Sequence, residues 1–176
     1  MTASSCRRTA KKATFWAVNA AHLHIILVHV PVVLVPLGCL LLALGRLRSA
    51  PALVSVARRT VVTAAVSAVP AFLLGEGAEE IVERLPGVSK KLISEHEEAA
   101  DIAFWLTVTA GLFSLWALFA VRSAVSGGGR ILSATLLISL AASGALAYAA
   151  QEGGKIRHPE AYDSAQTNEG GEGVSG

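Results

Sequence analysis

Four long apolar blocks constrain the fold of this chain more than any other feature of its sequence. A helix needs about 20 predominantly apolar residues to cross the hydrocarbon core of a bilayer. Such blocks lie at about 15–45, 54–74, 102–121 and 131–150. They occupy most of the 176 residues and leave no stretch for a separate soluble domain. The sequence therefore predicts an all-α fold, a bundle of four transmembrane helices over residues 15–151.

The composition agrees with a multi-pass membrane protein. Hydrophobic residues make up 53% of the chain and charged residues only 16%, against about 25% charged residues in soluble domains. A basic tail is predicted over residues 1–14 and a polar, glycine-rich tail over residues 152–176. The apolar run after the basic tail is too long for a cleavable signal. We expect a bacterial inner (cell) membrane protein that contacts the lipid bilayer and does not bind nucleic acid.

The stretch between the second and third apolar blocks, residues 75–101, is different in character. It holds eight of the thirteen acidic residues. Its apolar residues recur at helical spacing, which predicts two short amphipathic helices broken at Pro86-Gly87. We expect these short helices to lie flat on the membrane interface between transmembrane helices 2 and 3.

Charge is divided between the two membrane faces. Four crossings place both tails and residues 75–101 on one face, which then receives all thirteen acids and all five histidines. The opposite face receives six arginines and no acid. Two of these arginines, Arg58 and Arg59, lie near the start of the second block and are expected to snorkel to the headgroups. The orientation of the protein is left open.

The block His-Leu-His-Ile-Ile-Leu-Val-His-Val-Pro supplies three histidines. His29 lies about one turn below the interface, where an ionisable residue usually faces a bundle interior and marks a functional site. The alternative is a neutral histidine bonded to a carbonyl freed by the nearby prolines. His22 and His24 lie at the interface. At 100° per residue, His22 and His29 share one helix face while His24 points elsewhere.

Acidic side chains and two further histidines complete the candidate residues. Glu76 and Glu80 are four residues apart, so they share a helix face that either binds a hard cation or is solvated. The acids around His96 suit the start of a helix, whereas His96 itself has no such explanation. His158 follows the Gly153-Gly154 pair, which is predicted to turn the chain back toward the interface.

Several familiar sites are missing from the sequence. There is no Glu-x-x-His pair, no HExxH, no Walker loop and no GxSxG, so nothing supports hydrolysis and no catalytic residue is assigned. The two cysteines, Cys6 and Cys39, are not expected to pair, and no CxxCH motif for covalent haem attachment occurs. Whether the protein is an enzyme is left open.

The segment His-Ile-Ile-Leu-Val-His-Val-Pro, with His24 and His29 five residues apart, resembles a signature of small bacterial four-helix membrane proteins. This family is the domain of unknown function twenty-two thirty-one, whose members begin with a His-Pro-x-Leu-Val-His-Phe-Pro-like block and end with a Gly-Gly pair and a histidine. Gly153, Gly154 and His158 are similar to that ending. The resemblance covers roughly residues 20–160 and implies b-type haem binding or membrane redox work.

The leading functional hypothesis is a membrane protein that binds b-type haem and transfers electrons to or from a redox partner protein. Haem in a helical bundle is commonly held by histidines from facing helices. The candidate haem ligands are His24 or His29 with His96, and His158 is the fourth candidate. Against this hypothesis, the face that carries the histidines is rich in glutamate, which haem does not use as a ligand.

Two other functions stay open. The first is a divalent metal or proton site for transport or sensing, built from Glu76, Glu80, His96 and His158. Four helices are few for a transporter, so transport would require a homo-oligomer. The second is an accessory subunit whose acidic stretch docks a basic membrane partner.

Overall fold

The computed structural model describes residues 3–84, 86, 88–122, 128–158 and 160–162. Its helices are α1 (Ala3–Leu47), α2 (Pro51–Leu73), α3 (Gly75–Val82), α4 (Lys90–Arg122) and α5 (Gly128–Arg157). The described residues contain no strand, and the predicted all-α fold is confirmed. Most of the predicted C-terminal tail, residues 163–176, lies outside the described part of the chain.

The helices extend further than the apolar blocks predict. Helix α1 begins at Ala3, inside the predicted basic tail. Helix α4 begins at Lys90, so the second predicted amphipathic helix is the first three turns of α4 rather than a separate element. Helix α5 continues to Arg157, straight through the pair of glycines predicted to turn the chain. An apolar block measures only the part of a helix that lies in hydrocarbon, whereas Lys, Glu and Arg continue a helix readily into the aqueous layer.

Four helices are long and apolar enough to cross a membrane. The candidate spans are Ala21–Leu47, Pro51–Leu73, Lys90–Ala120 and Gly129–Arg157. Their outward faces carry large apolar side chains, among them Leu40, Val66, Leu112, Trp116 and Leu137. Their inward faces are mostly alanine. This distribution suits helices surrounded by lipid, because small residues let neighbouring membrane helices approach closely.

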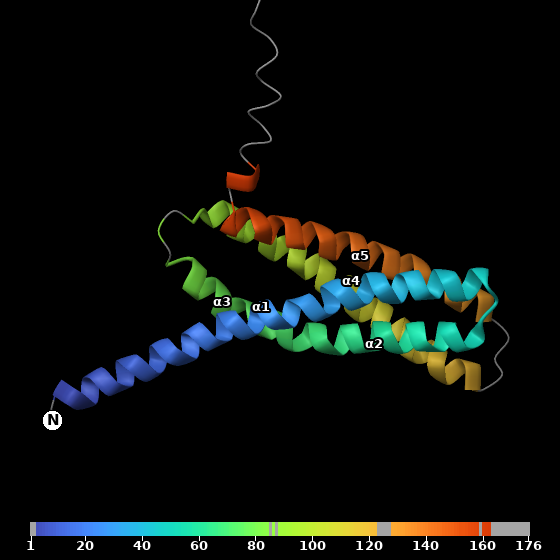
Figure 1. The fold of residues 1–176 in the computed structure, drawn as a ribbon, viewed down its shortest axis with the longest axis horizontal. Coiled ribbons are helices and arrows are strands. Elements are labelled where there is room, and N and C mark those ends of the chain that lie inside the picture. The colour runs from blue at the N-terminus through green and yellow to red at the C-terminus, as the bar shows by residue number, and fades with distance from the viewer. Residues whose placement is uncertain (1–2, 85, 87, 123–127, 159, 163–176) are drawn as a thin grey trace, which may run out of the picture.

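Each long helix packs against two others, so that the bundle is closed in the order α1, α2, α4, α5 (Figure 1). Helices α1 and α4 lie diagonally opposite each other in this ring. Glycines of α1 and α4 allow these two helices to approach α2 closely. A side-chain carbon at Gly38 of α1 would overlap Val61, and one at Gly111 of α4 would overlap Ala65.

The buried core is layered along the bundle. One layer joins Leu42 of α1, Val61 of α2 and Ala110 of α4. The next joins α1, α2 and α5 through Val35, Ala64 and Ala142. The last buried layer, Ala99, Ala103 and Ala149, is built by α4 and α5 alone. The α1–α2 and α4–α5 hairpins diverge toward this last layer, as the ribbon shows (Figure 1).

A tight turn connects α1 to α2 at the other end of the bundle. The Ala50 N–H donates to the Gly45 carbonyl at 2.9 Å, and the Ser49 N–H donates to the Arg46 carbonyl at 3.3 Å. Ser49 has a φ of 48°. This pair of bonds with a left-handed residue is a Schellman motif. Pro51 then occupies the start of α2, where its missing N–H costs nothing.

Candidate functional site

The histidine end of the bundle comprises α3, the first turns of α4 as far as Asp101, and the last turns of α5 from Ala149. The arginine end comprises the turn at residues 47–51 and the opposite ends of α4 and α5. Figure 1 shows α3 and these turns of α4 and α5 at the same end of the molecule, far from the turn that joins α1 to α2. All ten acids that the structure describes lie in the histidine end or just beyond α5 and α3.

His24 connects α1 to the end of α2. Its Nδ1 donates a hydrogen bond to the Ala71 carbonyl at 2.8 Å. Ala71 lies in the last turn of α2, where carbonyl groups lack a partner within the helix. Gly75 lies four residues later, and a side-chain carbon there would lie 3.7 Å from His24 Cε1, an ordinary contact. His24 therefore caps the C-terminal end of α2, and a side-chain carbon at position 75 would fit beside its ring.

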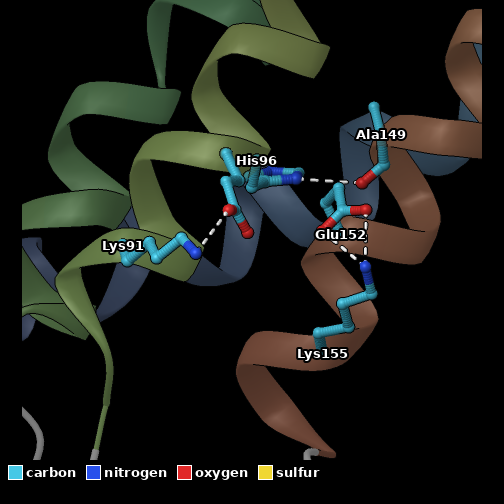
Figure 2. A network of polar contacts seen from close by, with 6 residues as sticks. Lys91, His96, Ala149, Glu152 and Lys155 are labelled. Atoms are coloured by element: carbon cyan, nitrogen blue, oxygen red, sulfur yellow. Dashed lines mark hydrogen bonds and ion pairs between the residues drawn. The ribbon is translucent and has the colours of Figure 1, made fainter. Parts of the chain in front are cut away.

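His96 makes the corresponding contact between α4 and α5. Its Nδ1 donates to the Ala149 carbonyl at 2.9 Å (Figure 2). A side-chain carbon on Gly153 would lie 3.1 Å from His96 Cε1 and 3.2 Å from Nδ1, closer than side chains normally approach. Gly153 therefore serves as the surface on which the imidazole ring rests. This explains the glycine inside a helix better than the predicted chain turn does.

The two histidine contacts share one design. In each hairpin a histidine near the start of the first membrane span donates Nδ1–H to an alanine carbonyl of the second helix, and a glycine follows that alanine four residues later. This repetition was not predicted from the sequence. The signal is the pair of Ala-x-x-x-Gly segments beginning at Ala71 and Ala149, which is too short to notice without the contacts.

The other three histidines face away from the bundle. His29 is exposed on α1, and its Nδ1 donates to the Ile25 carbonyl of the same helix. The predicted interior position of His29 is therefore wrong. The carbonyl that Pro31 leaves without its helical donor is that of Leu27, so the alternative explanation fails as well. His22 is exposed, and exposed His158 contacts Glu160 at 3.1 Å beyond α5.

The most buried acid was not singled out from the sequence. Glu152 on α5 is only 2% exposed, and its two carboxylate oxygens lie 2.7 and 3.0 Å from Lys155 Nζ (Figure 2). The two residues are three apart on one helix, a spacing that brings side chains together. This spacing was the available signal, but Glu152 stood at the predicted edge of a tail, where burial was not expected.

Helix α3 brings another carboxylate to His96. Glu79 is half-buried, and burial is the main cause of its raised pKa. The carboxylates of Glu97, Glu83 and Glu76 raise this pKa further, whereas His96 lowers it. Glu97 and His96 act on Glu79 through charge, while α3 itself packs chiefly against α1. A half-buried carboxyl in these surroundings holds a proton more readily than the carboxyl of a solvent-exposed glutamate.

The predicted cation ligands are not assembled. Glu76 and Glu80 are exposed on α3, and Glu80 lies 3.8 Å from Arg84. Within the described ranges, no group of three or more His, Cys, Asp and Glu side chains is close enough to hold a metal ion. The structure therefore does not bring Glu76, Glu80, His96 and His158 together as one site.

The hydrogen bonds of His24 and His96 determine which ring nitrogen is available. A carbonyl oxygen only accepts, so Nδ1 carries the proton in both residues. In the neutral ring Nε2 then has a free lone pair. Histidines that bind metals usually donate their other N–H to a carbonyl or carboxylate in this way. The Nε2 atom of each ring could therefore accept a hydrogen bond or act as a metal ligand.

Two of the three comparisons with known proteins gave no match. No curated protein matches the chain, and no solved structure matches it. The family described as "Predicted membrane protein (DUF2231)" matches residues 20–160. The matched range contains all four candidate spans and every histidine of the chain.

Proposed function

The chain belongs to the DUF2231 family of predicted membrane proteins, and we propose that it binds b-type haem between His24 and His96 and transfers electrons in the bacterial inner membrane. The observation that carries this proposal is the hydrogen bonding of both imidazoles. Each Nδ1–H is held by a main-chain carbonyl, at 2.8 Å for His24 and 2.9 Å for His96. Both Nε2 atoms are therefore free to serve as axial ligands.

The depth of the two histidines supports a shared ligand. His24 precedes Val35 by eleven residues, and Gly153, on which His96 rests, follows Ala142 by eleven residues. Val35 and Ala142 pack in one core layer. At the helical rise of 1.5 Å per residue, both rings lie about 16 Å from that layer. His24 and His96 therefore stand at one level on the two diagonal helices, α1 and α4.

The surrounding structure favours a flat cofactor at this level. The last buried core layer is made by α4 and α5 without α1 or α2, and beside it Phe72 of α2 stacks on Phe104 of α4 with ring centroids 4.1 Å apart. His29 and His158 are exposed and take no part in this pair. The exposed acids of α3 and early α4 form an acidic surface beside the site. Charge complementarity makes a basic redox protein the natural partner for this surface.

Absorption spectroscopy tests the proposal directly. Protein purified from haem-replete cells should show a Soret band and, on reduction, the sharp bands of six-coordinate haem. His24→Ala and His96→Ala should each remove the six-coordinate spectrum, because each deletes one axial ligand. His29→Ala is the matched control from the same helix and should keep the full spectrum. A colourless wild type, or variants with unaltered spectra, would rule the proposal out.

Proton handling is the second candidate, and the environment of Glu79 favours it. A carboxyl with a raised pKa next to a histidine is a suitable pair for passing protons. In this alternative His96 and Glu79 form the site and His24 is only a helix cap. A colourless protein in which His96→Ala shifts the titration of Glu79, while His24→Ala does not, would favour proton handling over electron transfer.

A further inference from the structure

Arg58 is buried in the bundle, although the sequence predicts that it snorkels to the headgroups. It lies seven residues into α2 and is 5% exposed. Its Nε atom is buried and has no hydrogen-bond partner in the described part of the chain. The neighbouring Arg59 is exposed, as predicted. Helical geometry separates the two, because adjacent residues point about 100° apart and only Arg58 faces a neighbouring helix.

The neighbour of Arg58 is α4. Ala65 lies seven residues after Arg58 on the same face of α2, and it packs under Gly111 of α4. The two helices run antiparallel, so Arg58 lies about two turns beyond Gly111 toward the end of α4. Between Gly111 and that level, α4 buries the hydroxyl of Ser114. Ser114 is fully buried, and no described residue accepts its hydroxyl proton or donates to it.

None of the acids that the structure describes lies at the level of Arg58. The sequence has no Asp or Glu before Glu76 and none between Asp101 and Glu152. Glu76 is eighteen residues from Arg58 along nearly continuous helices, which corresponds to roughly 27 Å. A buried charge without a partner is too costly to persist in a membrane protein unless a counter-charge comes from elsewhere. An anion from outside the described residues would supply the missing counter-charge of Arg58.

We propose that Arg58 and Ser114 bind the phosphate group of an anion between α2 and α4, independently of the haem proposal. The guanidinium fork matches the spacing of phosphate oxygens, and the serine hydroxyl supplies a further donor. Exposed arginines, Arg46, Arg48, Arg59 and Arg130, surround the nearby membrane face. They attract anionic headgroups to that face. The phosphate comes either from an anionic phospholipid or from free phosphate in solution.

Thermal unfolding of the delipidated, detergent-purified protein tests this site. In one arm the probe is phosphatidylglycerol in mixed micelles, with phosphatidylcholine, whose zwitterionic headgroup has no net charge, as the reference. In the other arm the probe is inorganic phosphate, with chloride at equal ionic strength as the reference. The wild type should melt higher with one probe than with its reference. A response only to phosphatidylglycerol identifies a lipid headgroup, and a response only to phosphate identifies the free ion.

Three variants show which residues produce the stabilisation by the probe. Arg58→Met should fold, because it replaces a buried charge by an apolar chain of similar length, and its affinity for the probe should fall roughly tenfold or more. Ser114→Ala should weaken binding to a smaller extent. Arg59→Met removes the same charge from the adjacent, exposed position and should keep the wild-type affinity. No response of the wild type to either probe, or equal losses in Arg58→Met and Arg59→Met, would overturn the proposal.

Discussion

Each end of the bundle buries one charged side chain, and the two ends stabilise it differently. At the histidine end, Glu152 is 2% exposed and forms an ion pair with Lys155 of its own helix. At the arginine end, Arg58 is 5% exposed, and within the described residues its Nε has no hydrogen-bond partner. The buried carboxylate at the histidine end is thus neutralised by a lysine of the chain, whereas the buried guanidinium at the arginine end requires a ligand as its counter-ion. A buried charge indicates a binding site only where the chain itself provides no counter-ion.

The largest effect is expected from Lys155→Met. This variant leaves the Glu152 carboxylate buried without its cation, and the loss of one partner of a buried pair is strongly destabilising. We expect the melting temperature to fall on the order of 10 °C. Arg58→Met should leave it unchanged or raise it, because that arginine has no partner within the chain to lose.

Replacing the second charge at the histidine end sharpens this contrast. Adding Glu152→Gln to Lys155→Met should recover most of the lost melting temperature, because no buried charge then remains. If the double variant melts as low as Lys155→Met, the ion pair is not what stabilises this end, and the difference between the two ends disappears.

The second effect compares the two glycines beside the histidine contacts. Gly153→Ala should destabilise the protein by about 1 kcal/mol, since overpacking against His96 costs about 1–3 kcal/mol and alanine regains roughly 1 kcal/mol of helix propensity. Gly75→Ala should instead be neutral or stabilising, because its new carbon meets His24 at an ordinary distance. Chemical or thermal unfolding of both variants measures the difference. An equal rise in the free energy of unfolding of both variants would show that Gly153 does not support the His96 ring.

The smallest effect concerns the pH dependence of the histidine end. The pKa of Glu79 is raised, first by burial and then by neighbouring carboxylates, so the folded state binds this proton more tightly than the unfolded state. Stability should therefore rise as pH falls through the raised pKa, and the gain is complete below the unfolded pKa. Glu79→Gln should be more stable than wild type at pH 7, by less than about 1 kcal/mol, with no difference at low pH.

A control from the same helix accompanies this titration. Glu80→Gln removes an exposed carboxylate that is paired with Arg84, and it should keep the wild-type pH dependence. A pH profile of Glu79→Gln that runs parallel to that of wild type would mean that Glu79 does not titrate unusually, and the proton-handling alternative would lose its support.

The sequence was sufficient for the fold class, the number of spans and the family. These follow from the lengths of apolar runs and from a few motif residues, and both kinds of information are local in the sequence. The ends of the helices were not predictable in the same way. Lys90 and Arg157 are terminal residues of helices that continue past the apolar blocks, where the choice between helix and loop is not set by hydrophobicity.

The candidate site was predicted only in part, because burial depends on which helix face meets a neighbour. His24 and His96 were among the candidate ligands, but so was His29, which the structure places on the exposed face of α1. The sequence could not decide between these histidines. The apolar pattern shows how far along a helix a residue lies, but it does not show whether its side chain faces a neighbouring helix or the lipid. The same ambiguity hid Glu152 and led to the wrong prediction for Arg58.

The two histidine contacts also determine how the molecule can deform. The α1–α2 hairpin is fastened at both ends, by the Schellman turn at Ser49 and by the His24–Ala71 contact. The α4–α5 hairpin is fastened by the His96–Ala149 contact. Each hairpin is therefore fastened internally, and the two hairpins are joined by the core layers around Leu42 and around Val35. We expect the easiest deformation to be a rotation of one hairpin against the other about these layers, which would change their separation at the histidine end and leave each hairpin internally unchanged.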